Sequence, residues 1–247
     1  MMLLRRSMDA PVSPTTVVTP PGLGMLAIEP FRALLEFAQA QYFHYQNHAQ
    51  GDGHAVVLFP GLGADHTYMA ALASHCERLG HACLHWGRGR NTGPSGPSAG
   101  WLAELASDIE ELVDEHPARV TFIGWSLGGI YAREVAKAIP ERVRQVITLG
   151  TPCANLGEST NAGWFCELLS GGAASVDREL DAKLGTPPPV HTTSIYSRSD
   201  GVVAWQACRL TPGLLAENIE VDSSHLGLIW HPDVLRAIGW RLRTHAS

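Results

Sequence analysis

Short apolar runs alternate with longer amphipathic segments over most of the chain. The apolar runs are rich in β-branched residues and predict strands, whereas the longer segments carry apolar residues at helical spacing. The expected strands cover residues 55–59, 81–85, 119–123, 143–149, 192–196 and 218–221. The expected helices cover residues 68–79, 102–115, 127–138 and 232–243. Nearly continuous apolar strands that alternate with helices indicate an α/β fold with a mostly parallel central sheet flanked by helices.

Two regions depart from this rhythm. Residues 1–28 include a stretch rich in Pro, Thr and Val without regular alternation, and we expect an extended N-terminal arm there. The next segment, from Pro30 to about Tyr45, has apolar residues at helical spacing and predicts an amphipathic helix that packs on the core, with Pro30 in its first turn. Between about 151 and 190, Gly and Pro pairs interrupt the pattern around an apolar group, which predicts a small cap or lid.

Length and composition add only broad limits. The chain has 247 residues, 45% of them hydrophobic, which is enough for one substantial core, and we expect one domain over residues 29–247. Its 18 basic and 24 acidic residues give a net charge of −6 without a dense basic run, so nothing favours nucleic acid as a partner. No signal-peptide core or membrane-spanning stretch is recognised, and a cytoplasmic protein is the default expectation.

Histidine is abundant but scattered. Most of the 12 histidines, such as His54 and His81, have no second ligand at helical or strand spacing. Tetrahedral metal sites need three or four ligands that converge on one point. We therefore expect no metal site.

The strongest chemical signal is residues 124–128, which read G-W-S-L-G and are followed by Gly129. They lie between a predicted strand and a predicted helix, as the G-x-S-x-G nucleophile motif requires. In that motif the serine occupies a strained turn, and small neighbours let the strand and the helix approach each other. We expect Ser126 to be a nucleophile, with a purely structural Gly-Ser turn as the alternative.

A serine hydroxyl near neutral pH needs a base to accept its proton and a carboxylate to orient that base. With this motif, the expected chain order is serine, acid, histidine. Asp200 follows a predicted strand and is the expected acid, while Asp222 is the competitor because it lies close to the base in sequence. His225 follows the last predicted strand and is the expected base; His231 and His245 are alternatives in or near the final helix.

Acyl transfer also needs hydrogen-bond donors for the developing oxyanion. We expect the backbone N–H groups of Leu127, after the nucleophile, and of Leu62, in the Gly-rich loop after the first strand. A simple strand-to-helix turn is the alternative for that loop. The bulky apolar residues beside the nucleophile and in the predicted cap predict a substrate pocket, with ordinary packing as an equal alternative: Trp125, Trp164, Phe165 and Leu168.

With these motifs in place, the sequence resembles the bacterial esterase and lipase branch of the α/β-hydrolase superfamily, from about residue 55 to residue 243. The stretches that carry the likeness are 58–63 (L-F-P-G-L-G), 124–129, 148–152 (T-L-G-T-P) and 223–228 (S-S-H-L-G-L). The chain has Pro60-Gly61 where that family often has His-Gly, and Cys153 where a histidine often follows Thr-Pro. The resemblance implies the α/β-hydrolase fold and acyl transfer through a serine ester, with no cofactor.

The expected function is therefore that of a serine carboxylic-ester hydrolase. Its substrate would be an uncharged, rather apolar ester, either a small molecule or lipid-like. An acyltransferase or a thioesterase would use the same serine, acid and histidine and would differ only in acceptor or leaving group. A non-catalytic binding relative is the third possibility, although such a relative would be expected to lack one of the three residues.

Overall fold

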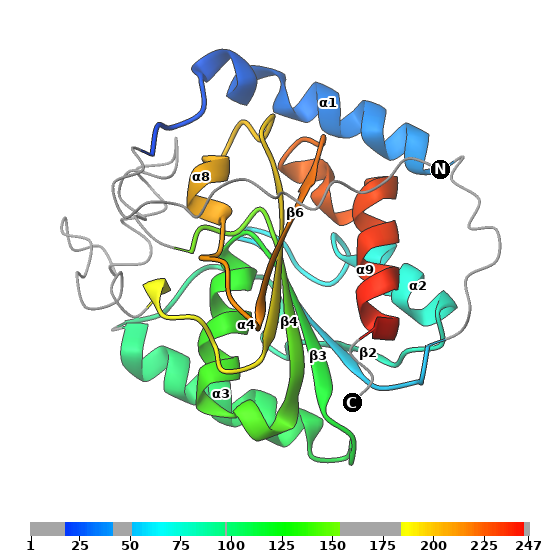
Figure 1. Ribbon diagram of the computed structural model, residues 1–247, viewed down its shortest axis with the longest axis vertical. Coiled ribbons are helices and arrows are strands. Elements are labelled where there is room, and N and C mark those ends of the chain that lie inside the picture. Colours follow the sequence, from blue (N-terminus) through cyan, green and yellow to red (C-terminus); the bar gives the residue numbers. More distant parts are fainter. Residues whose placement is uncertain (1–17, 42–50, 97, 154–183, 245–247) are drawn as a thin grey trace.

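The computed structural model of the protein describes residues 18–41, 51–96, 98–153 and 184–244. Within them, a sheet of six parallel strands has the order β2-β1-β3-β4-β5-β6 (Figure 1). The strands are β1 (Val56–Phe59), β2 (Cys83–His85), β3 (Val120–Trp125), β4 (Val143–Leu149), β5 (His191–Ser197) and β6 (Ala216–Val221). The parallel sheet predicted from the apolar runs is confirmed. Because all the strands run the same way, the loops that follow them share one edge, called here the carboxyl edge.

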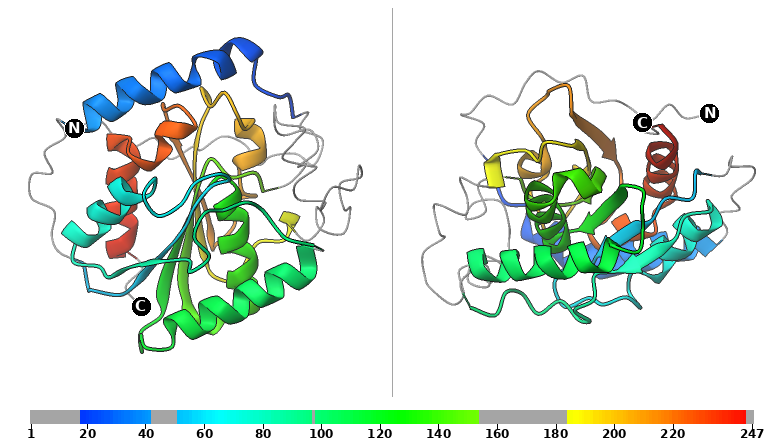
Figure 2. Two further views of the ribbon diagram at one scale, coloured as in Figure 1. Left: turned by 180° about the vertical axis from the view of Figure 1, so that it is seen from behind. Right: turned by 90° about the horizontal axis from the view of Figure 1, so that it is seen from below.

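Helices cover both faces of this sheet, as predicted. Alternate strand residues point to opposite faces, so Val57 and Phe59 pack with α3 (Ser98–Val113) and α4 (Leu127–Ala138). Val56 and Leu58 pack on the other face, with α2 (Ala70–Arg78) and α9 (Pro232–Thr244). Figures 1 and 2 show the two helix pairs on opposite sides of the sheet. Burial on both faces explains why the strands read as continuous apolar runs.

Short elements complete the described chain. They are the 3₁₀ turns η1 (Pro140–Arg142) and η2 (Leu226–Ile229) and the helix α8 (Trp205–Cys208). Residues 154–183 lie outside the described residues, so the cap, with Trp164, Phe165 and Leu168, stays a prediction. Residues 1–17 of the predicted arm lie outside them too. Among the described residues, no helix combines the length and the apolar character needed to cross a bilayer.

The helix α1 (Leu23–Gln41) starts earlier than predicted. Residues 23–28, expected to belong to an extended arm, are its first turns, and Pro30 lies inside the helix and not in its first turn. α1 runs across the carboxyl edge of the sheet, apart from the helix layers (Figures 1 and 2). The prediction failed because a proline is most common in a first turn, and the segment before it has no polar cap to mark an earlier start.

The face that α1 turns toward the protein is also not the predicted one. Phe31 and Leu34 are each 64% exposed, whereas Glu29 is only 2% and Glu36 only 8% exposed. The expectation that the apolar residues of this helix pack on the core is therefore wrong. The helix lies on loops whose main-chain N–H groups need acceptors, and buried carboxylates supply acceptors that Leu and Phe cannot.

Candidate active site

Ser126 occupies the sharp turn between β3 and α4. Its backbone has φ 53° and ψ −123°, and it is the one non-glycine residue with positive φ in the described part of the chain. Such a conformation costs about 1 to 3 kcal/mol and persists only where the surroundings enforce it. A Cβ atom at Gly124 would lie 2.5 Å from the carbonyl oxygen of Gly128, and one at Gly128 would lie 2.5 Å from that of Pro60. The glycines therefore allow the close approach that the turn requires.

The structure brings Ser126, His225 and Asp200 into one hydrogen-bonded chain. Nε2 of His225 lies 3.0 Å from Oγ of Ser126, and Nδ1 lies 2.7 Å from Oδ2 of Asp200. The second carboxylate oxygen, Oδ1, accepts hydrogen bonds from the N–H groups of Val202 and Val203, each at 2.8 Å. This network favours the tautomer in which Nδ1–H donates to Asp200 and Nε2 accepts the serine proton.

Opposing effects act on the imidazole of His225. Burial lowers its pKa, but the charge and hydrogen bond of Asp200, with a further contribution from the charge of Glu29, raise the pKa above its usual value. The imidazole is therefore a better proton acceptor than a buried histidine without carboxylate neighbours. The same charges would stabilise the imidazolium that forms when it takes a proton.

The alternative acids and bases lie elsewhere. Asp222 has a side chain that is 91% exposed, and it accepts a hydrogen bond from Ser199 at 2.5 Å. His231 accepts a hydrogen bond from the N–H of Asp233 at 3.3 Å, at the start of α9. His245 lies outside the described residues. Among the described candidates, Asp200 and His225 are therefore the pair that meets Ser126.

Two backbone N–H groups were expected beside the serine. Leu127 is the first residue of α4, where an N–H has no partner within the helix and the helix dipole favours negative charge. Leu62 lies in a loop held by Asn91, a fully buried residue that the sequence analysis did not single out. The side chain of Asn91 donates to the carbonyl of Pro60 at 2.7 Å, and the main-chain carbonyl of Asn91 accepts from the N–H of Gly63 at 2.7 Å. Only the tertiary structure reveals this support.

Gly150 is a second residue that sequence reasoning missed. It follows β4 and has φ +56°, a conformation that L side chains rarely adopt. A Cβ atom there would lie 3.0 Å from Nδ1 of His225 and 3.2 Å from Oδ2 of Asp200. Glycine at this position therefore leaves room for the hydrogen bond between the histidine and the aspartate.

Trp125 was expected to line a substrate pocket, with packing as the alternative. Its side chain is buried, and the indole N–H donates to the carbonyl of His225 at 3.0 Å. The ring stacks on Tyr68 with centroids 5.1 Å apart, and a Cβ atom at Gly61 would lie 2.5 Å from it. These contacts favour packing, because they support the histidine loop and fill the space around the indole.

A cavity of about 190 Å³ lies beside the Leu62 loop. Its lining includes the ends of β1 and β2 and the residues after them. None of the three hydrogen-bonded residues Ser126, His225 and Asp200 belongs to this lining. It is bounded by Leu58, Pro60, His66, Met69, His85, Trp86, Gly87 and Gly89.

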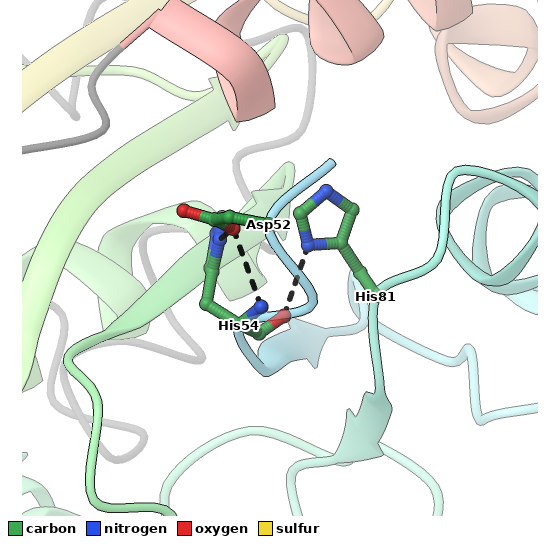
Figure 3. Close-up of side chains that lie close together, drawn as sticks. All are labelled: Asp52, His54 and His81. Atoms are coloured by element: carbon green, nitrogen blue, oxygen red, sulfur yellow. Dashed lines mark hydrogen bonds and ion pairs between the residues drawn. The ribbon is translucent and has the colours of Figure 1, made fainter. Parts of the chain in front are cut away.

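A second group of titratable side chains lies at the opposite, amino edge of the sheet (Figure 3). The side chains of Asp52, His54 and His81 offer potential metal-ligand atoms within 4.8 Å of one another. The sequence analysis treated the two histidines as isolated, but the structure places their ring centroids 4.4 Å apart. Within the described ranges, the residues that could hold a metal are therefore these three, and their hydrogen bonds decide whether they are available.

Protein groups already engage most of these atoms, whereas Nε2 of His81 is buried without a hydrogen-bond partner among the described residues. Nδ1 of His54 hydrogen-bonds to Asp52, whose other oxygen accepts from Arg144 at 2.6 Å. Nδ1 of His81 lies 3.0 Å from the carbonyl oxygen of His54, and its Nε2 faces Gly51 so closely that a Cβ atom would not fit there. The guanidinium of Arg144 adds a positive charge that opposes a metal ion. The group has the contacts of a structural network that joins the segment before β1 to β4.

Comparison with known proteins finds similarity to hydrolases. Residues 54–165 match the family model described as the alpha/beta hydrolase fold. Over 129 residues the chain is 33% identical to the pimeloyl-(acyl-carrier protein) methyl ester esterase of Salmonella heidelberg (strain SL476). The matched stretch covers 49% of this chain and 44% of that protein. The chain thus spans less than half the length of the curated relatives it matches.

Solved structures resemble the chain over a larger share of its length. The monoacylglycerol lipase of Paleococcus ferrophilus has a TM-score of 0.58 at 16% identity and covers 80% of this chain and 96% of its own. The thioesterase domain from the curacin biosynthetic pathway has a TM-score of 0.54 at 12% identity and covers 79% of this chain and 92% of its own. At such low identity, these likenesses concern the fold.

Proposed function

We propose that this chain, which has the α/β-hydrolase fold, is a serine hydrolase of carboxylic esters. Ser126 attacks the acyl carbon, and His225 takes the hydroxyl proton and passes it to the leaving alcohol. Asp200 orients His225, and water then attacks the acyl-enzyme with His225 again acting as the base. The observation that carries this proposal is the hydrogen-bonded chain from Ser126 through His225 to Asp200, which begins on a strained turn.

The oxyanion of each tetrahedral intermediate would be held by the backbone N–H groups of Leu62 and Leu127. The position of Leu127 at the N-terminus of α4 supports this role, because the N–H has no helical partner and the helix dipole adds positive potential. The network around Asn91 supports the role of Leu62 by fixing its loop. Each such donor is worth about 3 to 4 kcal/mol of transition-state stabilisation.

The proposed substrate is an uncharged, rather apolar ester. Esters are the substrate class in the name of the Salmonella relative, and the lipase from Paleococcus shares the fold. The cavity beside the Leu62 loop is lined by Leu58, Met69 and Trp86 together with polar groups, which suits a small apolar substituent. The polar side chains of its lining are the imidazoles of His66 and His85, and no carboxylate lines it.

The test is hydrolysis of p-nitrophenyl acetate, butyrate and decanoate by the wild type and by Ser126→Ala. We expect the variant to lose at least about 10⁴-fold in kcat, because it lacks the hydroxyl that is proposed to form the acyl-enzyme. Ser107→Ala, an exposed serine on α3, is the matched control and should hydrolyse like the wild type. A fluorophosphonate should label the wild type once, on the peptide that contains Ser126.

Two results would overturn the assignment. Turnover that is equal in Ser126→Ala and the wild type would remove the serine from the mechanism, and labelling of another residue would move the nucleophile. Acyl thioesters and competing alcohols belong in the same assay. Faster acyl transfer to an alcohol than to water, or a preference for thioesters, would redirect the proposal to an acyltransferase or a thioesterase with the same three residues.

A further inference from the structure

A single carboxylate of α1 reaches both loops that carry the acid and the base. Oε1 of Glu29 accepts hydrogen bonds from the N–H of Gly201, the residue after Asp200, at 2.7 Å and from the N–H of His225 at 3.1 Å. Oε2 accepts from the N–H of Leu226 at 3.4 Å. Glu29 is 2% exposed, so these main-chain groups replace the water that its charge would otherwise need.

The backbone around Gly201 is shaped to admit this helix. A Cβ atom at Gly201 would lie 2.6 Å from the carbonyl oxygen of Met25 and 2.8 Å from Cγ of Glu29. Any side chain there would push α1 away from the loop that holds Asp200. The glycine and the glutamate therefore depend on each other, although they are 172 positions apart in the sequence.

The same helix supports the base loop at a second point. Glu36 accepts hydrogen bonds from the N–H of Ser224 at 2.8 Å and from its hydroxyl at 2.6 Å. The hydroxyl of Ser223 lies 3.2 Å from Glu36 as well. Arg32 lies between the two glutamates on α1 and donates to Ser199 at 2.9 Å, in the acid loop. Charged side chains of α1 thus touch the residues before and after both Asp200 and His225.

We propose that Glu29 is a positioning residue for the ester hydrolysis proposed above, which it serves by holding the Asp200 loop and the His225 loop in register. The proposal rests on the proposed function, because it concerns the same hydroxyl, imidazole and carboxylate. Asp200 and His225 lie on separate loops, and the hydrogen bond between them tolerates little displacement. Glu29 bonds to the backbone of both loops, so its loss would let the imidazole drift from Ser126.

Glu29 also adds a charge that a neutral support would not supply. In the described part of the chain, several elements contribute residues that lie against His225. β3 and the turn after it give the uncharged Trp125 and Ser126, and Gly150 follows β4. The loop after β5 gives Asp200, and α1 gives Glu29. Both carboxylates favour the protonated imidazole and raise its pKa. Removing the charge of Glu29 should therefore move the acidic limb of the pH–rate profile to lower pH.

Two substitutions of Glu29 distinguish its hydrogen bonds to the loops from the effect of its negative charge. Glu29→Ala removes both, and we expect kcat to fall about 10- to 100-fold with KM changed by less than about twofold, because misplacement of a catalytic group slows the chemical step. Glu29→Gln keeps a carbonyl oxygen that can accept from Gly201 and His225. We expect its kcat to stay within about fivefold of the wild type, with the acidic limb moved to lower pH.

The control is Glu110→Ala, an exposed glutamate on α3, which should match the wild type in kcat and in pH profile. Far-UV circular dichroism and thermal unfolding show whether each variant folds. If Glu29→Ala does not fold, the Glu29→Gln pH profile decides: an unmoved acidic limb would overturn the proposal. In the Asp200→Asn background, Glu29→Ala should cost much less than it does alone, since both act through His225.

Fluorophosphonate labelling keeps this test apart from the proposed function. A wild type that is neither labelled at Ser126 nor active on esters would end the proposed function itself. A wild type that is labelled and active, with a Glu29→Ala variant equally fast in labelling and hydrolysis, would overturn the role of Glu29 alone. Slower labelling of folded Glu29→Ala, with wild-type labelling of Glu110→Ala, would support it.

Discussion

The sheet carries two chains of hydroxyl, imidazole and carboxylate, one at each edge. At the carboxyl edge, His225 lies 3.0 Å from the hydroxyl of Ser126 and hydrogen-bonds to Asp200. At the amino edge, Nε2 of His54 lies 2.8 Å from the hydroxyl of Thr121, and Nδ1 hydrogen-bonds to Asp52. Thr121 belongs to β3, and Ser126 to the turn that follows the same strand. Residue types and hydrogen bonds alone do not distinguish them.

The backbone around the two hydroxyls does distinguish them. Ser126 lies on a turn with positive φ beside the N-terminus of α4. Thr121 lies within β3 and is fully buried, and its N–H donates to the carbonyl of Ala55 at 2.9 Å. A hydroxyl within a sheet has no free N–H groups beside it to hold an oxyanion, and no substrate can reach it. The strained turn at Ser126 therefore makes a nucleophile possible, whereas the combination of hydroxyl, imidazole and carboxylate alone does not.

Charge separates the two histidines as well. Burial lowers the pKa of His54, the hydrogen bond of Asp52 raises it, and the electrostatic effects of His81 and Arg144 lower it, with a net decrease. The pKa of His225 is raised, because its charged neighbours are carboxylates. Arg144 shares Asp52 with His54 and so weakens the effect of that carboxylate on the imidazole. The comparison teaches that the pKa of a buried histidine depends on burial and on all of its charged neighbours together, and not on its hydrogen-bonded carboxylate alone.

The largest expected difference between the two edges is the change in kcat when the aspartate of each edge is replaced by asparagine. Asp200→Asn should lower kcat about 10⁴-fold, because an amide at this position favours the wrong tautomer of His225. Asp52→Asn should keep kcat within about twofold, since its histidine faces Thr121 and no substrate. Steady-state hydrolysis of p-nitrophenyl butyrate measures both. Asp222→Asn is a further control, and a larger loss at Asp52 or Asp222 than at Asp200 would invert the assignment.

The next effect is the response to pH. His225 must be neutral to accept the serine proton, and its pKa is raised above the usual 6.5. We therefore expect kcat/KM to increase about tenfold per pH unit below that raised pKa, so that the rise extends above pH 6.5. A pH–rate profile measures this. His54→Asn should leave the profile unmoved, and a shift in that variant would contradict the separation of the two chains.

The stability should respond with opposite signs at the two histidines. The folded pKa of His225 is raised, so its contribution to stability is present below the unfolded value of 6.5 and is lost as pH rises through the folded pKa. The folded pKa of His54 is lowered, so its contribution is present above 6.5 and is lost as pH falls toward the folded pKa. Acid should therefore reduce activity through His225 and stability through His54.

The sequence predicts the serine turn well because the turn is a local feature. Its requirements lie within a few neighbouring residues, where Gly124 and Gly128 provide space and the flanking strand and helix have clear patterns. The parallel sheet follows from the same kind of local pattern. His225 and Asp200 are predicted from chain order, and the structure brings both to Ser126.

The supports of these residues are not local, and the sequence did not reveal them. Glu29 is 196 positions from His225, and nothing in its segment marks it as an acceptor for distant N–H groups. Helical periodicity instead predicted that Phe31 and Leu34 pack inward, a reading that assumes an apolar surface beneath the helix. The surface beneath α1 consists of two polar loops, which only the assembled sheet creates. Asn91 and Gly150 were missed for the same reason.

The smallest expected effect sharpens the comparison at the second hydroxyl. Thr121→Val keeps the shape of the side chain but removes the partner of His54 and of Gln145, whose Nε2 lies 3.3 Å from the hydroxyl. We expect the free energy of unfolding to fall by about 1 to 2 kcal/mol, because buried polar groups lose a hydrogen bond. We expect kcat/KM to stay within about twofold, since the site at the other edge is untouched.

Urea unfolding and ester hydrolysis of the same sample test both parts, with Thr121→Ser as the matched control that keeps the hydroxyl. Thr121→Ser should retain the hydrogen bond to His54 and lose only a methyl group, so its stability should fall by about 1 kcal/mol at most. A folded Thr121→Val that had lost its activity would show that the two edges are coupled through β3. The hydrogen bond between Thr121 and His54 would then influence catalysis at the other edge. A hydrogen bond that only stabilises the fold should not change turnover in a variant that is still folded.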